Sequence, residues 1–282
     1  MFGSQVIKLN DEEFYEITDI ICKSTGLIYR KNKQYLLEYK LSPRLKELNF
    51  NAFRDYIYYL KYPAINKQEI QVLINLITIN ETYFFRERYH IDFMIKKAIP
   101  ELAQTGKNKF KIWSAACSTG EEPYSIAILL KENSLTSKFN FEIIASDIDT
   151  DCLNKAKKGQ YKLNSFRSDD SSLINKYFIC NDSFYTLKNE ISGIVKFYRL
   201  NLNDNSFISL VSNIDFLFCR NVLIYFDIDV KKKVIDQFYN VLNNGGFLFL
   251  GYAETLSRIS DKFVLINFGE GSYYKKKDSS MG

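Results

Sequence analysis

The segment from Trp113 to Pro123, WSAACSTGEEP, has the composition of a strand end that opens into a ligand site. Its small residues let a ligand approach the backbone, and in doubly wound sheets ligands bind at the carboxyl ends of the strands. A helix N-terminus favours an anion, but Glu121 and Glu122 already supply negative charge there. The segment therefore favours a cationic ligand over a pyrophosphate. The alternative is that the glutamates only stabilise the start of the helix.

A second acidic segment, ASDID at 145–149, follows the next apolar run. Asp147 can accept hydrogen bonds from both hydroxyls of a ribose, although it lies 27 residues after Gly120, more than the ~20 of the dinucleotide fingerprint. The alternative for Asp149 is that it caps the next helix. S-adenosylmethionine satisfies both segments because it carries a ribose and a positive sulfonium, whereas NAD and ATP are anionic.

These segments need parallel strands to position them. From Phe110 onward, short apolar runs alternate with helical segments, a pattern typical of a parallel sheet with crossover helices. Short alternating runs at about 161–198, including 194–198, predict antiparallel strands of an inserted subdomain. We expect the strands of the main sheet at residues 110–117, 141–145, 214–219 and 247–251.

The sequence pattern of residues 1–78 predicts a separate helical domain. Asn10 and Glu13 form a capping box before the first helix, and Asn66 and Glu69 repeat that pattern. The overall expectation is an α/β protein: an all-α domain at 1–78, a linker with a connecting helix at 79–108, and a Rossmann-like domain at 109–282. The small antiparallel β subdomain is inserted into this domain at about 161–198.

Composition narrows the class of protein. The chain has 282 residues, of which 46% are hydrophobic and 25% charged, and a formal charge of +5, as expected of an ordered globular protein. No stretch offers the ~20 apolar residues of a membrane helix. Residues 1–14 carry three acids where a secretory signal needs an apolar core, so we expect a cytosolic protein. A single histidine, His90, excludes a multi-histidine metal site, and we expect no metal.

Four segments together resemble the bacterial CheR family of chemotaxis receptor methyltransferases. They are NETYFFRE at 80–87, SAACSTGEEPYS at 114–125, ASDID at 145–149 and FCRNVLIYFD at 218–227. The resemblance implies a Rossmann-like methyltransferase domain and a protein-glutamate O-methyltransferase that uses S-adenosylmethionine and releases S-adenosylhomocysteine. Its products would be glutamyl methyl esters on chemotaxis receptors, which serve sensory adaptation. A glutamate is ionised near pH 7 and needs no general base.

The resemblance also implies the site residues. Arg86 and Tyr225 are the expected catalytic residues: Arg86 would pair with the carboxylate of the methionyl moiety or of the substrate, and Tyr225 would lie near the reacting methyl group. The alternatives are an ion pair of Arg86 with Glu81 or Glu87 and a core position for Tyr225. The expected cofactor-binding residues are Asn80, Thr82, Arg86, Glu122, Asp147, Asn201, Leu202, Arg220 and Asn221.

The helical domain contains a basic stretch that could attract an acidic partner. Between Cys22 and Lys46 the only acid is Glu38, whereas the cations are Lys23, Arg30, Lys31, Lys33, Lys40, Arg44 and Lys46. The stretch is either a solvated face or a surface for the cytoplasmic helices of chemotaxis receptors, which the resemblance favours over nucleic acid. The segment 179–183 lacks the glycine-bearing loop of family members that dock on a receptor's C-terminal pentapeptide, so we expect no such tether.

The sequence is also compatible in part with two other functions. A methyltransferase for another acceptor is disfavoured because residues 219–222 read Cys-Arg-Asn-Val and not Asn-Pro-Pro-Tyr, the type associated with amino-group methylation of bases. A catalytically silent regulator would bind the cofactor or a receptor without turnover, and the intact Arg86, Asp147 and Tyr225 argue against it.

Overall fold

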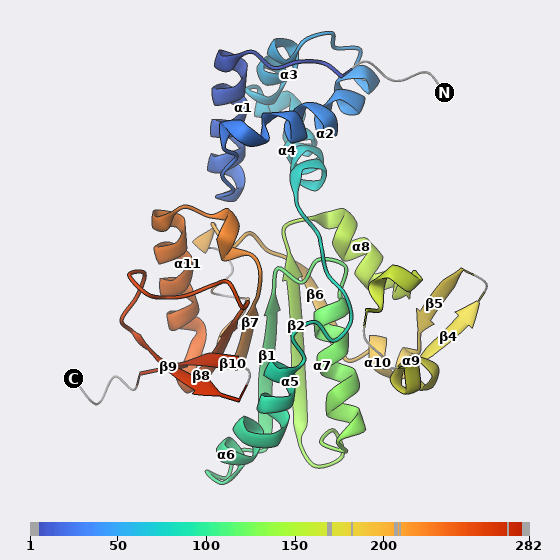
Figure 1. The fold of residues 1–282 in the computed structure, drawn as a ribbon, viewed down its shortest axis with the longest axis vertical. Helices are drawn as coiled ribbons and strands as arrows, with labels where there is room; N and C mark the ends of the chain where they lie inside the picture. Colours follow the sequence, from blue (N-terminus) through green and yellow to red (C-terminus); the bar gives the residue numbers. More distant parts are fainter. Residues whose placement is uncertain are drawn as a thin grey trace.

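The chain forms a helical unit joined to a larger α/β unit (Figure 1). The computed structural model describes residues 6–167, 171–181, 183–205, 208, 210–269 and 271–277, and only the backbone of 63–67. The helical unit packs around an apolar cluster of its own, which includes Phe14, Leu41 and Phe53. Its helices are α1 (Asp11–Thr25), α2 (Gln34–Glu47), α3 (Phe53–Leu60) and α4 (Pro63–Ile77).

The two predicted capping boxes have different outcomes. At α1 the Asn10 side chain accepts from the Glu13 amide and the Glu13 side chain accepts from the Asn10 amide, both at 2.9 Å, which confirms the first. The second prediction is wrong, because α4 already begins at Pro63. Proline suits the first turn of a helix, where its missing N–H would have no partner. Glu69 lies buried within α4 and accepts hydrogen bonds from Arg44 and Tyr56.

A seven-stranded sheet forms the centre of the α/β unit, in the order β6-β2-β1-β7-β8-β10-β9. The first five are parallel, and β10 runs antiparallel to both its neighbours. The strands are β1 (Lys109–Ala115), β2 (Asn140–Asp147), β6 (Val195–Arg199), β7 (Ile214–Cys219), β8 (Leu242–Leu250), β9 (Phe263–Phe268) and β10 (Gly271–Lys276).

Both faces of the sheet are covered, which explains its continuous apolar runs. In β7, Phe216 and Phe218 stack on β8 phenylalanines in the apolar cluster that includes α7, whereas Leu217 and Cys219 pack in the cluster with α11. The flanking helices are α5 (Tyr89–Phe93), a π-helical turn (Met94–Ala98), α6 (Ile99–Ala103), α7 (Glu121–Glu132), α8 (Thr150–Lys158) and α11 (Ile228–Val241).

A small antiparallel sheet with the order β3-β5-β4 lies beside the main sheet, as predicted (Figure 1). The prediction of an antiparallel strand at 194–198 is wrong, because β6 pairs in parallel with β2. As the edge strand of the main sheet, β6 exposes residues such as Tyr198 and so alternates like an antiparallel strand. The subdomain contains β3 (Gln160–Tyr161), α9 (Ser171–Tyr177), β4 (Phe178–Asn181), β5 (Phe184–Leu187) and α10 (Asn189–Ser192).

The linker leaves α4 as extended chain and reaches α5 after passing the edge of the main sheet (Figure 1). We propose that the domain limits fall at this linker, as the sequence predicts. None of the helices in the described ranges combines the length and the apolar character that crossing a membrane requires.

Asp149 ties the helical unit to the sheet. Its Oδ1 caps α8 by accepting from the amides of Asp151 and Cys152 at 2.9 and 3.0 Å, which confirms the capping alternative. Its Oδ2 accepts from Thr78 Oγ1 and Asn80 Nδ2, both at 2.7 Å. Asp149 is 1% exposed, so it fixes the linker from inside the protein.

We predict that Asp149→Ala lowers the free energy of unfolding by about 2–4 kcal/mol. The variant loses a helix cap and leaves buried donors without an acceptor. The matched control is Asp227→Ala, since among the described residues Asp227 caps α11 through one backbone amide, that of Val230, and should contribute about 1 kcal/mol. Urea denaturation of both variants checks the prediction, and equal losses would contradict the role of Asp149 as a tie.

Candidate functional site

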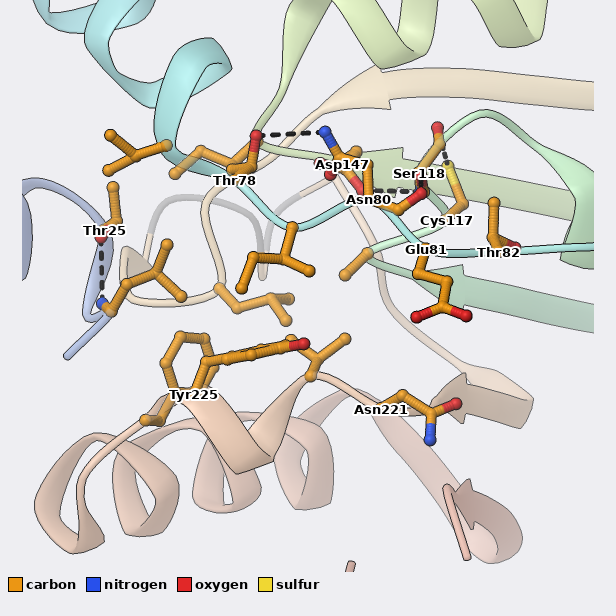
Figure 2. A pocket seen from close by; sticks show the side chains of 18 of the residues that line it. Thr25, Thr78, Asn80, Glu81, Thr82, Cys117, Ser118, Asp147, Asn221 and Tyr225 are labelled. Atoms are coloured by element: carbon orange, nitrogen blue, oxygen red, sulfur yellow. Dashed lines mark hydrogen bonds between the residues drawn. The ribbon is translucent and has the colours of Figure 1, made fainter. Parts of the chain in front are cut away.

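One large cavity opens at the carboxyl edge of the sheet, where β1 and β7 lie side by side and their connections diverge (Figure 2). This is the topological switch point at which doubly wound sheets bind ligands. Its walls come from the end of α1 and the residues after it, the linker, and the chain that follows β1, β2, β6 and β7. The cavity includes all the predicted site residues: Asn80, Thr82, Arg86, Glu122, Asp147, Asn201, Leu202, Arg220, Asn221 and Tyr225.

The segment after β1 brings its backbone close to Asp147. Ala116, Ser118 and Gly120 all have left-handed backbone conformations, with φ of 58°, 50° and 92°. This path directs the Ser118 amide at Asp147 Oδ2, at 2.7 Å, while the Asp149 amide donates to Oδ1 at 2.9 Å. Each carboxylate oxygen has taken one donor and can accept another. Burial, reinforced by the nearby Asp149 charge, raises the pKa of Asp147 to about 6 against the effect of these hydrogen bonds.

Glu122 and Arg220 form a buried ion pair in the cavity wall. Arg220 Nε donates to Glu122 Oε2 at 2.5 Å, and Ser114 Oγ donates to Glu122 Oε1 at 2.6 Å. The Glu121 carboxyl is also enclosed, and burial raises its pKa. The negative charge expected at the start of α7 is therefore partly compensated, because Glu122 is paired with Arg220 and Glu121 does not line the cavity. The compensating cation, Arg220, directly follows β7. The sequence around Glu122 therefore gives no indication of it.

Arg220 also fixes the turn that presents Arg86. Its Nη1 donates to the carbonyls of Arg86 and Glu87 at 2.7 and 3.3 Å. The Arg86 guanidinium donates to the Glu81 carbonyl oxygen at 3.0 Å, and among the described residues it pairs with no carboxylate. The alternative of an ion pair with Glu81 or Glu87 is therefore not what the structure shows, and the Arg86 charge remains available to an anion.

Tyr225 extends its phenol into the cavity (Figure 2). It is not a core residue, since its side chain lines the cavity beside Val222 and Phe226. Burial raises the pKa of Tyr225, while the positive charge of Arg86 acts in the opposite direction. Tyr225 is therefore a neutral hydrogen-bond donor at physiological pH, close enough to Arg86 to interact with it electrostatically.

The helical unit contributes a wall that sequence reasoning missed. Ile28 donates its amide to the Tyr225 carbonyl at 3.0 Å, and Leu27 forms an antiparallel bridge with Phe226. Gly26 makes this approach possible, because a Cβ there would lie 2.9 Å from Val230 Cγ1. Gly26 ends α1 in the left-handed conformation, but no local sequence signal indicates its distant contact with α11. The missed wall residues of this unit are Thr25, Leu27, Ile28, Tyr29, Lys33, Ile77 and Thr78.

The other predicted residues have different local roles. Asn80 donates to Asp149, and Asn201 donates to the Ser24 carbonyl at 2.8 Å, so both amides join the two units. Leu202 is a buried apolar wall residue. Thr82 lines the cavity from the linker, and Asn221 faces it from the end of β7 (Figure 2).

The lining fits S-adenosylmethionine by its chemistry. Asp147 offers acceptors for ribose hydroxyls, as argued above. Ile148, Leu200, Leu202 and Phe226 provide apolar surface for a flat base. The cavity also holds the unpaired charge of Arg86, which suits a carboxylate. Nucleoside, base and carboxylate therefore each find matching groups in one cavity.

Fold and cavity together define a Rossmann-like methyltransferase, with its site at the switch point between β1 and β7. Family models described as "CheR methyltransferase, all-alpha domain" and "CheR methyltransferase, SAM binding domain" match residues 12–78 and 80–271. The chain belongs to the CheR methyltransferase family. The match confirms both the predicted family and the S-adenosylmethionine cofactor.

Curated relatives match over nearly the full length. The "Chemotaxis protein methyltransferase 2" of Vibrio cholerae is 37% identical over 273 residues, covering 96% of this chain and 94% of the relative. The "Chemotaxis protein methyltransferase" of Borreliella burgdorferi is 35% identical, with 89% and 90% covered. The protein of that name in Escherichia coli is 31% identical, with 96% and 93% covered.

The raised pKa of Asp147 predicts a pH-dependent stability. The contribution of Asp147 is fully present below about pH 4 and is lost as pH rises through about 6, because the folded state binds the proton more tightly. Asp147→Asn cannot titrate. From pH 4 to pH 7, wild type should therefore lose roughly 2–3 kcal/mol of unfolding free energy relative to this variant.

Urea unfolding at several pH values measures this difference. Asp261→Asn, which replaces an exposed carboxylate, is the control and should follow the wild-type curve. Parallel curves for wild type and Asp147→Asn would show that Asp147 does not titrate in this range.

Proposed function

We propose that this methyltransferase acts on glutamate side chains of chemotaxis receptors and forms glutamyl methyl esters for sensory adaptation. The observation that carries the proposal is the convergence of all the sequence-predicted site residues on one cavity. They come from segments as far apart as the linker and the end of β7. The names of the relatives support a role in chemotaxis.

The residues around the cavity favour an acceptor that is already an anion. The single histidine, His90, is buried, and its Nε2 lies 3.0 Å from the Ser272 carbonyl oxygen. Burial and the charge of Arg220 lower the pKa of His90 to about 3. Tyr225 keeps its proton, and both oxygens of Asp147 accept amides. A carboxylate needs no base, whereas an ammonium group must first lose a proton.

We infer separate roles for the predicted residues. When bound, S-adenosylmethionine supplies an electrophilic methyl group. Asp147 would hold the ribose, Asn201 and Leu202 the adenosine side of the cavity, and Arg86 a carboxylate of the cofactor or of the acceptor. Tyr225 would orient groups near the methyl carbon through its phenol. Positioning and electrostatics then supply most of the rate.

The helical unit is proposed as the contact with the cytoplasmic helices of a receptor. The structure lowers the number of cations in this basic stretch that could bind a receptor, because several of them contact groups of the protein itself. Lys31 pairs with Asp11, Arg44 pairs with Glu69, and Lys40 donates to the carbonyls of Ile77 and Thr78. The charges of Lys31 and Arg44 are then partly compensated by carboxylates, and Lys40 directs its ammonium group at the end of α4.

Two cations of the stretch remain as candidates for the contact. Arg30 and Lys33 are exposed, and neither forms an ion pair within the described ranges. Lys33 also lines the cavity. An acidic receptor helix could therefore meet positive charge close to the place where its glutamate enters. We propose that the protein acts in the cytoplasm, where such receptor helices lie.

We also propose that no pentapeptide tether operates. In the small sheet Asn181 pairs with Phe184, so only two residues connect β4 and β5. Ser183 is one of them, and Asp182 lies outside the described residues. The connection has no room for the longer glycine-bearing loop of tethered relatives.

Transfer of a labelled methyl group to cytoplasmic receptor fragments tests the proposed function. We expect base-labile label on glutamates, at equal rates for fragments with and without the C-terminal tail. Base-stable label would favour another acceptor, and cofactor binding without transfer would favour a silent regulator. A rate that depends on the tail would overturn the absence of a tether.

Charge reversal tests the proposed receptor contact. Arg30→Glu with Lys33→Glu should lower kcat/KM for receptor fragments about tenfold at low salt, because an acidic partner is then repelled, and less at high salt. Lys109→Glu with Lys138→Glu changes the net charge equally at the amino edge of the sheet and is the control. Equal effects of the two double variants would contradict a specific contact.

A further inference from the structure

Glu254, which follows β8, binds the loop that follows β7. Its Oε2 accepts from the amides of Asn221 and Gly251 at 2.8 and 2.7 Å, and its Oε1 accepts from the Val222 amide at 2.8 Å. One carboxylate therefore satisfies three backbone donors from two adjacent strand ends. Hydrogen bonds from amides to an ionised carboxylate are among the stronger ones in proteins.

The bound loop has a conformation that needs support. Asn221 is left-handed, with φ of 61°, and it lines the cavity. Asparagine adopts this region more readily than most non-glycine residues, and hydrogen bonds from its surroundings decide whether it stays there. The Glu254 bond to the Asn221 amide fixes this conformation directly, and the bond to Val222 fixes the next peptide.

The contact continues to Tyr225. The Tyr225 amide donates to the Val222 carbonyl at 3.1 Å, so the turn that carries the phenol begins at the residue that Glu254 binds. Arg220, directly before Asn221, holds Glu122 and the carbonyls of Arg86 and Glu87. A displacement of this loop would therefore reach several groups of the cavity together.

Gly251 leaves the space that the carboxylate occupies. A Cβ at Gly251 would lie 2.7 Å from Asn221 Nδ2, 2.8 Å from the Asn221 amide nitrogen and 2.9 Å from Glu254 Oε2. An alanine there must push Asn221 or Glu254 away. The glycine and the glutamate thus belong to one arrangement.

We propose that Glu254 is a positioning residue for methyl transfer, which acts by holding Asn221 and the Tyr225 turn in the geometry that binds the cofactor and aligns its methyl group. Glu254 acts through the loop and does not touch the reacting atoms. The proposal depends on the methyltransferase activity and is independent of which acceptor is used.

Glu254→Gln is the principal test, since the amide group has nearly the same volume but replaces one acceptor oxygen by a donor. At least one backbone amide then loses its partner. We expect the dissociation constant of S-adenosylhomocysteine to rise about tenfold and kcat to fall at least as much, with the KM for the receptor fragment little changed. The melting temperature should stay within a few degrees of wild type.

Glu101→Gln is the matched control, because within the described residues the Glu101 carboxylate makes one ion pair, an exposed one with Lys275. Gly251→Ala is the second variant: it keeps the carboxylate, crowds Asn221 and should show the same pattern. If Glu254→Gln does not stay folded, Gly251→Ala decides. Wild-type affinity and kcat in the deciding variant, or losses that only follow its unfolded fraction, would overturn the proposal.

Calorimetry of the wild-type protein with S-adenosylhomocysteine distinguishes a failure of the proposal for Glu254 from a wrong assignment of the cavity. If wild type does not bind S-adenosylhomocysteine, the assignment of the cavity is wrong. If wild type binds but transfers no methyl group to receptor fragments, the proposed acceptor is wrong, and the affinity measurements on Glu254→Gln still decide the role of Glu254.

Discussion

The buried ion pair between Glu122 and Arg220 is the interaction on which the site depends. The Arg220 side chain is 3% exposed and the Glu122 side chain 13%, so both charges are largely removed from water. Such a pair is worth little as net stability, but removing one partner leaves an uncompensated charge. Its value here is geometric, because one guanidinium joins the start of α7, the end of β7 and the turn at Arg86.

The helical unit is as much a part of the site as the sheet. Backbone pairing of Leu27 and Ile28 with the segment at Tyr225 closes one side of the cavity. On the other side, Asp149 holds the linker through Thr78 and Asn80. The α/β unit thus holds the helical unit and its linker at two separate places, by backbone pairing at Tyr225 and Phe226 and by the Asp149 carboxylate. A cofactor that fills the cavity would contact both units and so stabilise their arrangement.

Local patterns predicted much of the fold, because the forces they report are local. The capping box at Asn10 and the apolar runs of β1 and β7 reflect the helix end and the double-sided burial directly. Predictions from local patterns were wrong where the surrounding structure determines the conformation. Asn66 and Glu69 match the sequence pattern of a capping box, but the helix already begins at Pro63. The residues of β6 alternate in exposure because β6 is the edge strand of the parallel sheet. The strand order depends on pairings between strands far apart in the chain, which no local pattern reports.

The candidate site shows the same division. The resemblance to family motifs located the residues of the cavity, because such motifs are recognised from residue types at fixed spacings along the chain. The ion pair between Glu122 and Arg220 spans 98 residues, and the contact of Glu254 with Asn221 spans 33. No periodicity reports such pairs. The motifs therefore identified residues that line the cavity but not the partners of their side chains. They also gave no indication that Lys33 lines the cavity or that Glu254 binds the Asn221 amide.

The paired start of α7 changes how charge acts in this cavity. Glu122 is paired with Arg220, and Glu121 does not line the cavity, so α7 presents no unpaired glutamate to a sulfonium there. The other charged residues of the described lining are Lys33, Glu81, Arg86 and Asp147. Of these, Asp147 suits a ribose and Arg86 suits a carboxylate, two groups that the cofactor keeps after losing its methyl group. Product would therefore keep both of these contacts of the cofactor.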